Sequence, residues 1–165
     1  EDDRVELLEG VITPKMVHNP AHDGTLQIVE EALRSRLPSG WIIRNQSSLT
    51  TSDSEPEPDL VVVRGGSRDY LRHHPHAEDT CLAVEVADSS LQRDRVKTRL
   101  YARAGVPVYW IVNLVDLQIE VHWQPTGPSA HPTYAQKAIY RGGDHVPFSI
   151  PGTAEHQLPV VDLLP

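Results

Sequence analysis

Two acidic residues stand at or inside apolar stretches, where a carboxylate is unexpected. Asp59 immediately precedes the apolar run at 60–63, and Glu85 lies in the middle of another at 81–87. An ionised carboxylate in an apolar interior is costly unless it is protonated or paired with a cation. Two such groups on neighbouring strands would repel each other, and a divalent cation between them removes that repulsion. Because Mg²⁺ is usually held by one or two carboxylates plus water and phosphate oxygens, these residues predict a metal site.

Each acid also has a structural interpretation. Asp59 can cap the junction between a loop and a strand, and Glu85 can form a salt bridge with Lys97 or an arginine. Buried ion pairs stabilise a fold less well than apolar packing does. A structural role therefore explains Glu85 less well than a functional one.

The direction of the side chains supports a shared site. Residues two apart in a strand share a face, so Glu85 lies beside the small residues Ala83 and Ala87, which leave room for an ion and a substrate. The opposite face, with Val84 and its neighbour, is expected to pack against a helix. Lys97 follows on the next helix, four residues before a tyrosine and thus on the same helical face. We expect its long side chain to reach the two carboxylates.

Hydrophobic patterning predicts the elements that carry these residues. Alternating or continuous apolar runs predict strands at 4–13 (broken by a turn at 9–10), 41–49, 58–63, 81–87, 108–112, 118–123 and 134–140. Helical spacing predicts helices at 21–37 and 93–104, the second anchored by Val96, Leu100 and Ala104. The Pro-rich tail at 147–165 is expected to be irregular. Strands alternating with helices predict an α/β fold: one domain over 1–165, with a mixed central β-sheet flanked by helices.

An acid, a second acid and a helical lysine, in the order Asp59, Glu85 and Lys97, resemble the PD-(D/E)XK nuclease superfamily. More closely, the chain resembles the Uma-type restriction endonuclease family, many members of which are known only as a domain of unknown function. The matching stretches are ELLEG at 6–10, His22, PDLVV at 58–62, VEVADSS at 84–90, KxxxYAxAGVP at 97–107 and YWIV at 109–112. The resemblance covers nearly the whole chain.

This resemblance implies a restriction-endonuclease-like fold and a Mg²⁺- or Mn²⁺-dependent hydrolysis of DNA phosphodiester bonds. Asp59, Glu85 and the backbone carbonyl of Val86 would bind the ion, which lowers the pKa of a bound water and polarises the phosphate. Lys97 would orient or activate that water and stabilise the charge of the transition state. The implied accessory residues are Glu6 and, less directly, Glu9 as outer carboxylates, His22 as a hydrogen-bond partner, and Tyr101.

The chain departs from the family pattern at a few positions. The superfamily lysine usually follows the acid by two residues, where this chain has Ala87, so the role is carried to Lys97. Val108 replaces an acid that many relatives carry, and Asn113 replaces an aspartate. Neither change touches the implied metal ligands.

Charge and composition limit the other classes of function. There are 15 Lys and Arg against 23 Asp and Glu, giving a net charge of −8. A protein that grips nucleic acid through phosphate contacts alone usually has a basic surface, so DNA binding here needs a metal or a local patch. The arginine-rich helix face at 93–103 is the candidate patch, or else a solvated face that balances Asp94. No apolar run approaches the roughly 18 residues of a membrane span.

Cysteine and histidine give weaker signals. The single cysteine, Cys81, excludes an internal disulfide or a cysteine-rich zinc site and is expected to be buried, which favours a reducing, cytoplasmic setting. The three histidines at 73–76 are expected in a surface loop. His18 and His22 are four residues apart, but Pro20 between them argues against a helical pair that binds zinc.

Two further classes of function remain open. One is a non-catalytic relative of the nuclease fold that binds DNA or protein through a vestigial site, and the acidic net charge favours it. The other is a metal-dependent hydrolase of a small phosphoester. A homodimer is also open, because nucleases that cut both strands often pair by symmetry.

Overall fold

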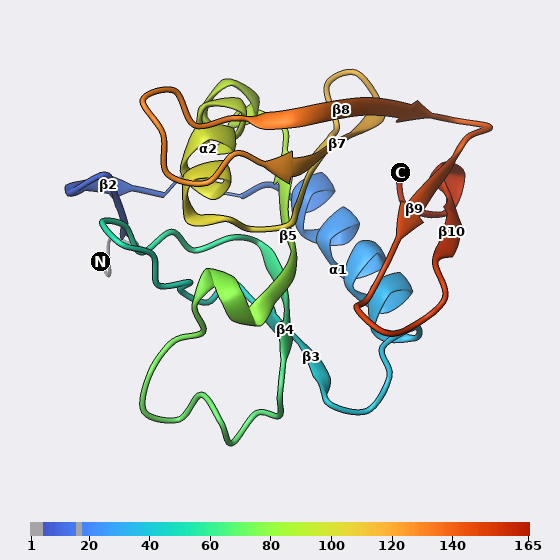
Figure 1. The fold of residues 1–165 in the computed structure, drawn as a ribbon. Coiled ribbons are helices and arrows are strands. Elements are labelled where there is room, and N and C mark those ends of the chain that lie inside the picture. The colour runs from blue at the N-terminus through green and yellow to red at the C-terminus, as the bar shows by residue number, and fades with distance from the viewer. Residues whose placement is uncertain (1–4, 16–17) are drawn as a thin grey trace.

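The computed structural model describes residues 5–15 and 18–165, and within them a six-stranded mixed sheet forms the middle layer of the fold (Figure 1). The strands are β1 (Val5–Leu8), β2 (Val11–Pro14), β3 (Trp41–Asn45), β4 (Leu60–Arg64), β5 (Thr80–Ala87), β6 (Val108–Asn113), β7 (Gln118–Pro125), β8 (Tyr134–Arg141), β9 (His145–Phe148) and β10 (His156–Pro159). The central sheet has the order β3-β4-β5-β6-β7-β8, and only β5 and β6 run parallel. The predicted mixed α/β fold is confirmed.

Helix α1 (Pro20–Arg34) covers one face of the sheet. The side chain of Asn19 accepts a hydrogen bond from the His22 N–H, and Pro20 occupies the first turn, where no N–H partner is needed. A stripe of buried residues, Leu26, Val29 and Leu33, packs into the same core as the Val84 side of β5. The helix predicted on that side of the strand is therefore confirmed.

Helix α2 (Leu91–Ala104) covers the opposite face and connects the parallel strands β5 and β6. It ends at Gly105, whose left-handed conformation (φ 81°) suits glycine. The predicted apolar stripe is wrong at its first member, because Val96 is 62% exposed. The buried side of this helix instead carries Asp94, Lys97 and Tyr101, so it presents polar groups to the sheet.

The C-terminal segment is not irregular, as the sequence had suggested. Strands β9 and β10 form an antiparallel hairpin, followed by the short 3₁₀ helix η2 (Val160–Asp162). Figure 1 shows this red segment beside α1. Phe148, Leu158 and Val160 from it are buried in the core on the α1 side. Four-residue strands that include prolines are too short to give a clear alternating pattern.

Strands β1 and β2 form a separate hairpin at the edge of the molecule, turning at Glu9 and Gly10 as predicted. A backbone bridge between Leu7 and Glu55 fastens the hairpin to the chain before β4. No helix within residues 5–15 and 18–165 has the length and apolar character needed to cross a membrane.

Candidate functional site

The two acids singled out in the sequence meet in one small pocket of about 40 Å³. Asp59 stands at the start of β4 and Glu85 near the end of β5, and these two strands are antiparallel neighbours. The backbone N–H of Asp59 donates to Glu85 Oε2 at 3.3 Å, and each acid is only 4% exposed. The residues lining the pocket include both acids together with Glu6, Lys15, His22, Val86, Asp94 and Lys97.

Lys97 reaches Glu85 from α2, as the sequence predicted. Its Nζ lies 2.9 Å from Glu85 Oε1 and 3.1 Å from Glu6 Oε2, and its side chain is 5% exposed. The hydroxyl of Tyr101, one helical turn later, donates to the same Glu85 oxygen at 3.0 Å. One lysine and one tyrosine therefore fix the orientation of the Glu85 carboxylate.

Asp59 is held by a different set of donors. Its Oδ2 atom accepts hydrogen bonds from the Val86 N–H at 2.8 Å and from His22 Nε2 at 3.1 Å. Among the described residues, its Oδ1 atom accepts no hydrogen bond. The predicted partner His22 thus touches the acid pair, while metal binding by the carbonyl oxygen of Val86 stays a prediction.

Acidic side chains outnumber the cationic ones that line the pocket. Three of its buried acids, Glu6, Glu85 and Asp94, lie within 4.0 Å of the ammonium of Lys97. Burial, together with the neighbouring carboxylates, raises the pKa of Glu85 to about 8, although Lys97 acts against this shift. Burial likewise raises the pKa of Asp94 to about 6. In the absence of a further cation, this cluster takes up a proton near neutral pH.

The cationic partners Lys97 and His22 also have raised pKa values, because the carboxylates stabilise their charged forms. Burial alone would lower the pKa of Lys97, but the carboxylates of Glu85 and Glu6 outweigh it and hold that pKa above its usual value. Burial would raise the pKa of Asp59, and the hydrogen bond and charge of His22 instead hold it low. His22 has a raised pKa because its bond to Asp59 outweighs desolvation.

These residues fit a hard divalent cation. Carboxylate oxygens are the ligands that Mg²⁺ prefers, and Asp59 Oδ1 is left without a hydrogen bond within the described part of the chain. A divalent ion would compensate an excess of buried negative charge, which apolar packing cannot do. The pocket volume of about 40 Å³ is enough for an ion and a water molecule.

Sequence reasoning missed Asp94, which had been read as a partner of surface arginines. Its carboxylate accepts a hydrogen bond from the Ser90 hydroxyl at 2.5 Å and lies 4.0 Å from Lys97 Nζ. Ser90 therefore serves Asp94 instead of capping the helix with its side chain. The spacing of three residues between Asp94 and Lys97 places both on one helical face and was the available signal.

The outer role suggested for Glu9 does not agree with its contacts. Its carboxylate pairs with Arg99 and Arg103 on α2, and it does not line the acid pocket. Glu6, three residues earlier, is the acid of this hairpin that faces the pocket.

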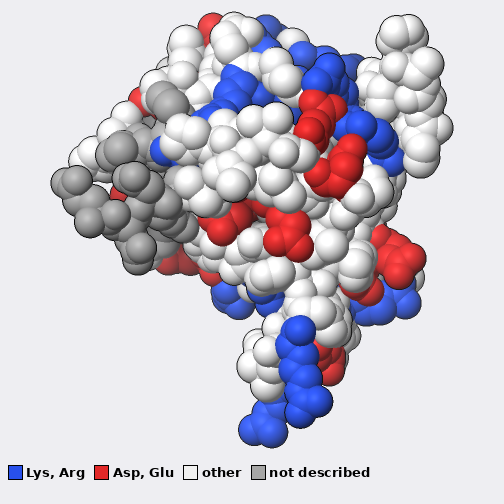
Figure 2. All heavy atoms as spheres, turned by 90° about the vertical axis from the view of Figure 1, so that its left-hand side faces the viewer, with Lys and Arg blue, Asp and Glu red and all other residues white. Residues whose placement is uncertain are grey.

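Three of the four arginines of α2 are engaged by acids of the same chain other than Asp94, and the fourth, Arg93, donates to the Pro14 carbonyl. Arg99 and Arg103 pair with Glu9, and Arg95 pairs with Glu120 at 2.6 Å. On the face shown in Figure 2, Lys and Arg form separate groups interrupted by acidic and uncharged side chains. Helix α2 therefore does not present a basic patch of free arginines.

His18 and His22 do not form a helical pair, as the sequence indicated, because His18 precedes α1, yet their side chains lie against each other. Pro20 is the first residue of α1 and so starts the helix rather than breaking it. The two imidazole rings stack with their centroids 3.9 Å apart. Cys81 is buried as predicted, with a pKa raised to about 12 by desolvation.

The fold has a solved counterpart. The crystal structure of a putative nuclease belonging to DUF820, from Anabaena variabilis ATCC 29413, has a TM-score of 0.76 with this chain at 14% sequence identity, covering 99% of this chain and 90% of that one. The two chains therefore share one fold, in which this chain places a mixed sheet between two helices. The Uma2 family, described as "putative restriction endonuclease", matches residues 1–159, and the chain belongs to this family. The comparison with curated proteins finds no match.

Proposed function

We propose that the chain is a divalent-metal-dependent endonuclease that hydrolyses DNA phosphodiester bonds, with residues 1–165 acting as one nuclease domain. The observation that carries this proposal is the convergence of Asp59, Glu85 and Lys97 in one buried pocket with an excess of negative charge. Family membership supports the nuclease class.

The acids provide the binding site for the ion. Asp59 and Glu85 would hold Mg²⁺ or Mn²⁺, with the Val86 carbonyl as an expected third ligand. When bound, the ion supplies Lewis-acid activation of water and of the scissile phosphate. His22 and Tyr101 hold the Asp59 and Glu85 carboxylates in place through the hydrogen bonds described above.

Lys97 is protonated and can therefore donate hydrogen bonds. Because the surrounding carboxylates keep its pKa above the usual value, it stays an ammonium at neutral pH and does not serve as a general base. We propose that it orients the attacking water by hydrogen bonding and stabilises the negative charge that grows on the phosphate in the transition state.

Cleavage of DNA tests the proposal directly. Purified protein is incubated with supercoiled, linear and single-stranded DNA in the presence of Mg²⁺ or Mn²⁺. We expect cleavage that Glu85→Gln reduces by at least about 100-fold, the loss typical of removing a group that acts in the transition state. Glu120→Gln, which alters a buried acid outside the pocket, is the matched control and should retain activity. Intact DNA under every condition, with Glu85→Gln indistinguishable from the parent protein, would refute the proposal.

A non-catalytic binding module is the second candidate, and the arginine pairing on α2 favours it. With Arg95, Arg99 and Arg103 engaged by acids of the chain, few of these cations are free to hold a phosphate backbone. DNA binding without cleavage, and without heat of Mg²⁺ binding in calorimetry, identifies this alternative. Turnover of a small phosphodiester but not of DNA identifies a small-molecule hydrolase instead. A homodimer and a cytoplasmic setting stay predictions.

A further inference from the structure

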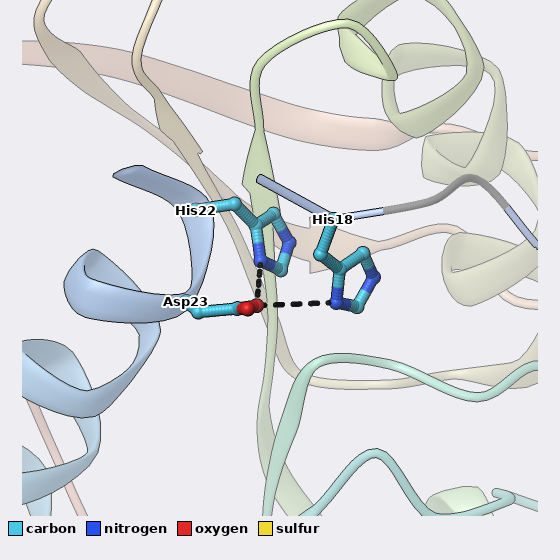
Figure 3. A group of neighbouring side chains, drawn as sticks. All are labelled: His18, His22 and Asp23. Carbon is cyan, nitrogen blue, oxygen red and sulfur yellow. Dashed lines mark hydrogen bonds and ion pairs between the residues drawn. The ribbon is translucent and has the colours of Figure 1, made fainter. Parts of the chain in front are cut away.

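A second group of potential metal-binding side chains adjoins the acid pocket at the start of α1, and two of its members, His18 and His22, also line that pocket. His18, His22 and Asp23 each offer one ligand atom, and these atoms all lie within 4.8 Å of one another. Figure 3 shows both imidazole rings directed to the same Asp23 oxygen. The cluster combines two nitrogens with one oxygen, whereas the acid pocket offers mainly oxygens.

The distances in this cluster suit a tetrahedral ion. Asp23 Oδ1 lies 3.3 Å from His22 Nδ1 and 3.4 Å from His18 Nδ1. Two ligands of a tetrahedral zinc ion, each bonded at about 2.0–2.1 Å, are about 3.3 Å apart. A direct hydrogen bond between a charged imidazole and a carboxylate is shorter, at about 2.7–2.9 Å. The two spacings are thus longer than a strong direct bond and close to those of ligands on one ion. Because the rings stack with their centroids 3.9 Å apart, one imidazole has to turn for both Nδ1 atoms to bind the same ion.

The hydrogen bonds around the cluster already resemble the outer shell of a metal site. A histidine that binds a metal through one ring nitrogen usually donates its other N–H to a carboxylate. His22 does this, because its Nε2 lies 3.1 Å from Asp59 Oδ2 while its Nδ1 faces Asp23. The same hydrogen bond links this cluster to the acid pocket.

The cluster also has an open side. The side chain of Asp23 is 63% exposed, and it lines a surface cleft together with His18, Gln46 and Asn45. The side-chain amide of Gln46 contacts His18 Nδ1 at 3.1 Å. An ion bound here would have to displace this contact at His18 Nδ1, and water from the cleft can complete the shell.

We propose that His18, His22 and Asp23 form a second cation site that takes Zn²⁺ and is linked to the acid pocket through the His22–Asp59 hydrogen bond. Imidazole nitrogens select zinc and similar transition metals over Mg²⁺. A bound ion fixes His22 as an Nε2–H donor to Asp59, and thereby keeps the Asp59 carboxylate oriented. The site does not depend on the nuclease proposal, because it can be occupied whether or not DNA is cleaved.

Metal titration of the full chain tests this site without any activity assay. Zn²⁺ binding is followed by calorimetry in the presence of excess Mg²⁺, and Co²⁺ binding by visible absorption, which is much stronger for a tetrahedral than for an octahedral site. We expect one Zn²⁺ per chain and a tetrahedral Co²⁺ spectrum. His18→Ala should weaken Zn²⁺ binding by at least about 100-fold, beyond the loss caused by removing an outer-shell partner.

Three further variants make the result decisive. Asp23→Asn changes an exposed side chain at nearly constant shape, so it should keep the fold and still weaken Zn²⁺ binding. His73→Ala, in an exposed loop, should bind Zn²⁺ as the parent protein does, and so should Glu85→Gln. Absence of Zn²⁺ binding, retained affinity in both His18→Ala and Asp23→Asn, or loss of affinity only in Glu85→Gln would overturn the proposal. The last outcome would place the ion in the acid pocket.

Discussion

Replacement of Lys97 by methionine removes the one ammonium that touches Glu85 and Glu6 while nearly preserving the length of the side chain. The lost contacts are 2.9 and 3.1 Å long and buried. Removing one partner of a buried ion pair costs about 3–5 kcal/mol. Because Glu85 already has a pKa of about 8, it can neutralise itself with a proton. We therefore expect a loss of about 3 kcal/mol in the free energy of unfolding at pH 7, near the lower end of that range.

The sign of the pH dependence follows from the same carboxyls. Groups whose pKa is raised by folding bind protons in the folded state before they do so in the unfolded chain, so acid stabilises the folded state relative to the unfolded one. The penalty of Lys97→Met should shrink as the pH falls from about 9 to 5, because Glu85 and then Asp94 become neutral over that range. Added Mg²⁺ should stabilise this variant more than it stabilises the parent protein.

Urea unfolding followed by tryptophan fluorescence measures these differences. The double variant Lys97→Met/Glu85→Gln should recover at least half of the loss, because it removes the acid left unpaired. Lys137→Met is the control: this lysine also pairs with a buried acid but is 43% exposed, so it should cost about 1 kcal/mol or less. Equal stability of Lys97→Met and Lys137→Met, or no recovery in the double variant, would refute the charge argument.

Three other outcomes follow from residues inside and outside the pocket. Mg²⁺ affinity measured by calorimetry should rise about tenfold per pH unit from pH 6 to 7 and level off above pH 8, since the ion must displace a proton from Glu85; a flat profile contradicts this. Glu120→Gln should lower the free energy of unfolding by about 2 kcal/mol at pH 7, less than full linkage because its cationic partners are partly exposed. Burial opposes ionisation of Glu120, but hydrogen bonds from Arg95 and Lys137 lower its pKa to about 2. In urea titrations the stabilisation by Glu120 should therefore disappear as the pH falls from about 4.5 through 2. A stability difference between Glu120→Gln and the parent protein that persists in acid argues against this account. Gly105→Ala should cost about 1 kcal/mol by thermal unfolding, because its φ is positive while no atom obstructs the added Cβ; an unchanged midpoint would contradict the strain.

Local sequence patterns located the acid pair because side chains alternate between the two faces of a strand. Alternation along 81–87 fixed which side of β5 carries Glu85, and small neighbours on that side marked the pocket. The same reasoning erred on α2, where an apolar stripe had been assumed to face the core. Leu100 of that stripe is buried, but the buried side of the helix also carries Asp94 and Lys97, and Lys97 pairs with Glu6 of β1 and Glu85 of β5. The spacing of apolar residues along a helix does not reveal ion pairs between its charged residues and other elements.

Contacts between distant segments explain the other differences. Glu9 lies more than 80 residues before Arg99, and no local pattern reveals that they pair. Pro20 was read as an obstacle between two histidines, although a proline in the first turn fits a helix start and lets His18 stack on His22. The family pattern supplied the remaining site residues, since hydrogen bonding of His22 to Asp59 depends on how α1 meets the sheet.

The attachment of the β1–β2 hairpin has a consequence for how the protein responds to ionic strength. Glu6 enters the acid pocket from this hairpin, and the hairpin is held to α2 by the surface pairs of Glu9 with Arg99 and Arg103. Dissolved salt weakens such pairs, since charges are screened over about 8 Å at physiological ionic strength. We therefore expect concentrated salt to loosen the hairpin before it disturbs the central sheet, so that amide hydrogens of β1 exchange faster while those of β5 remain protected.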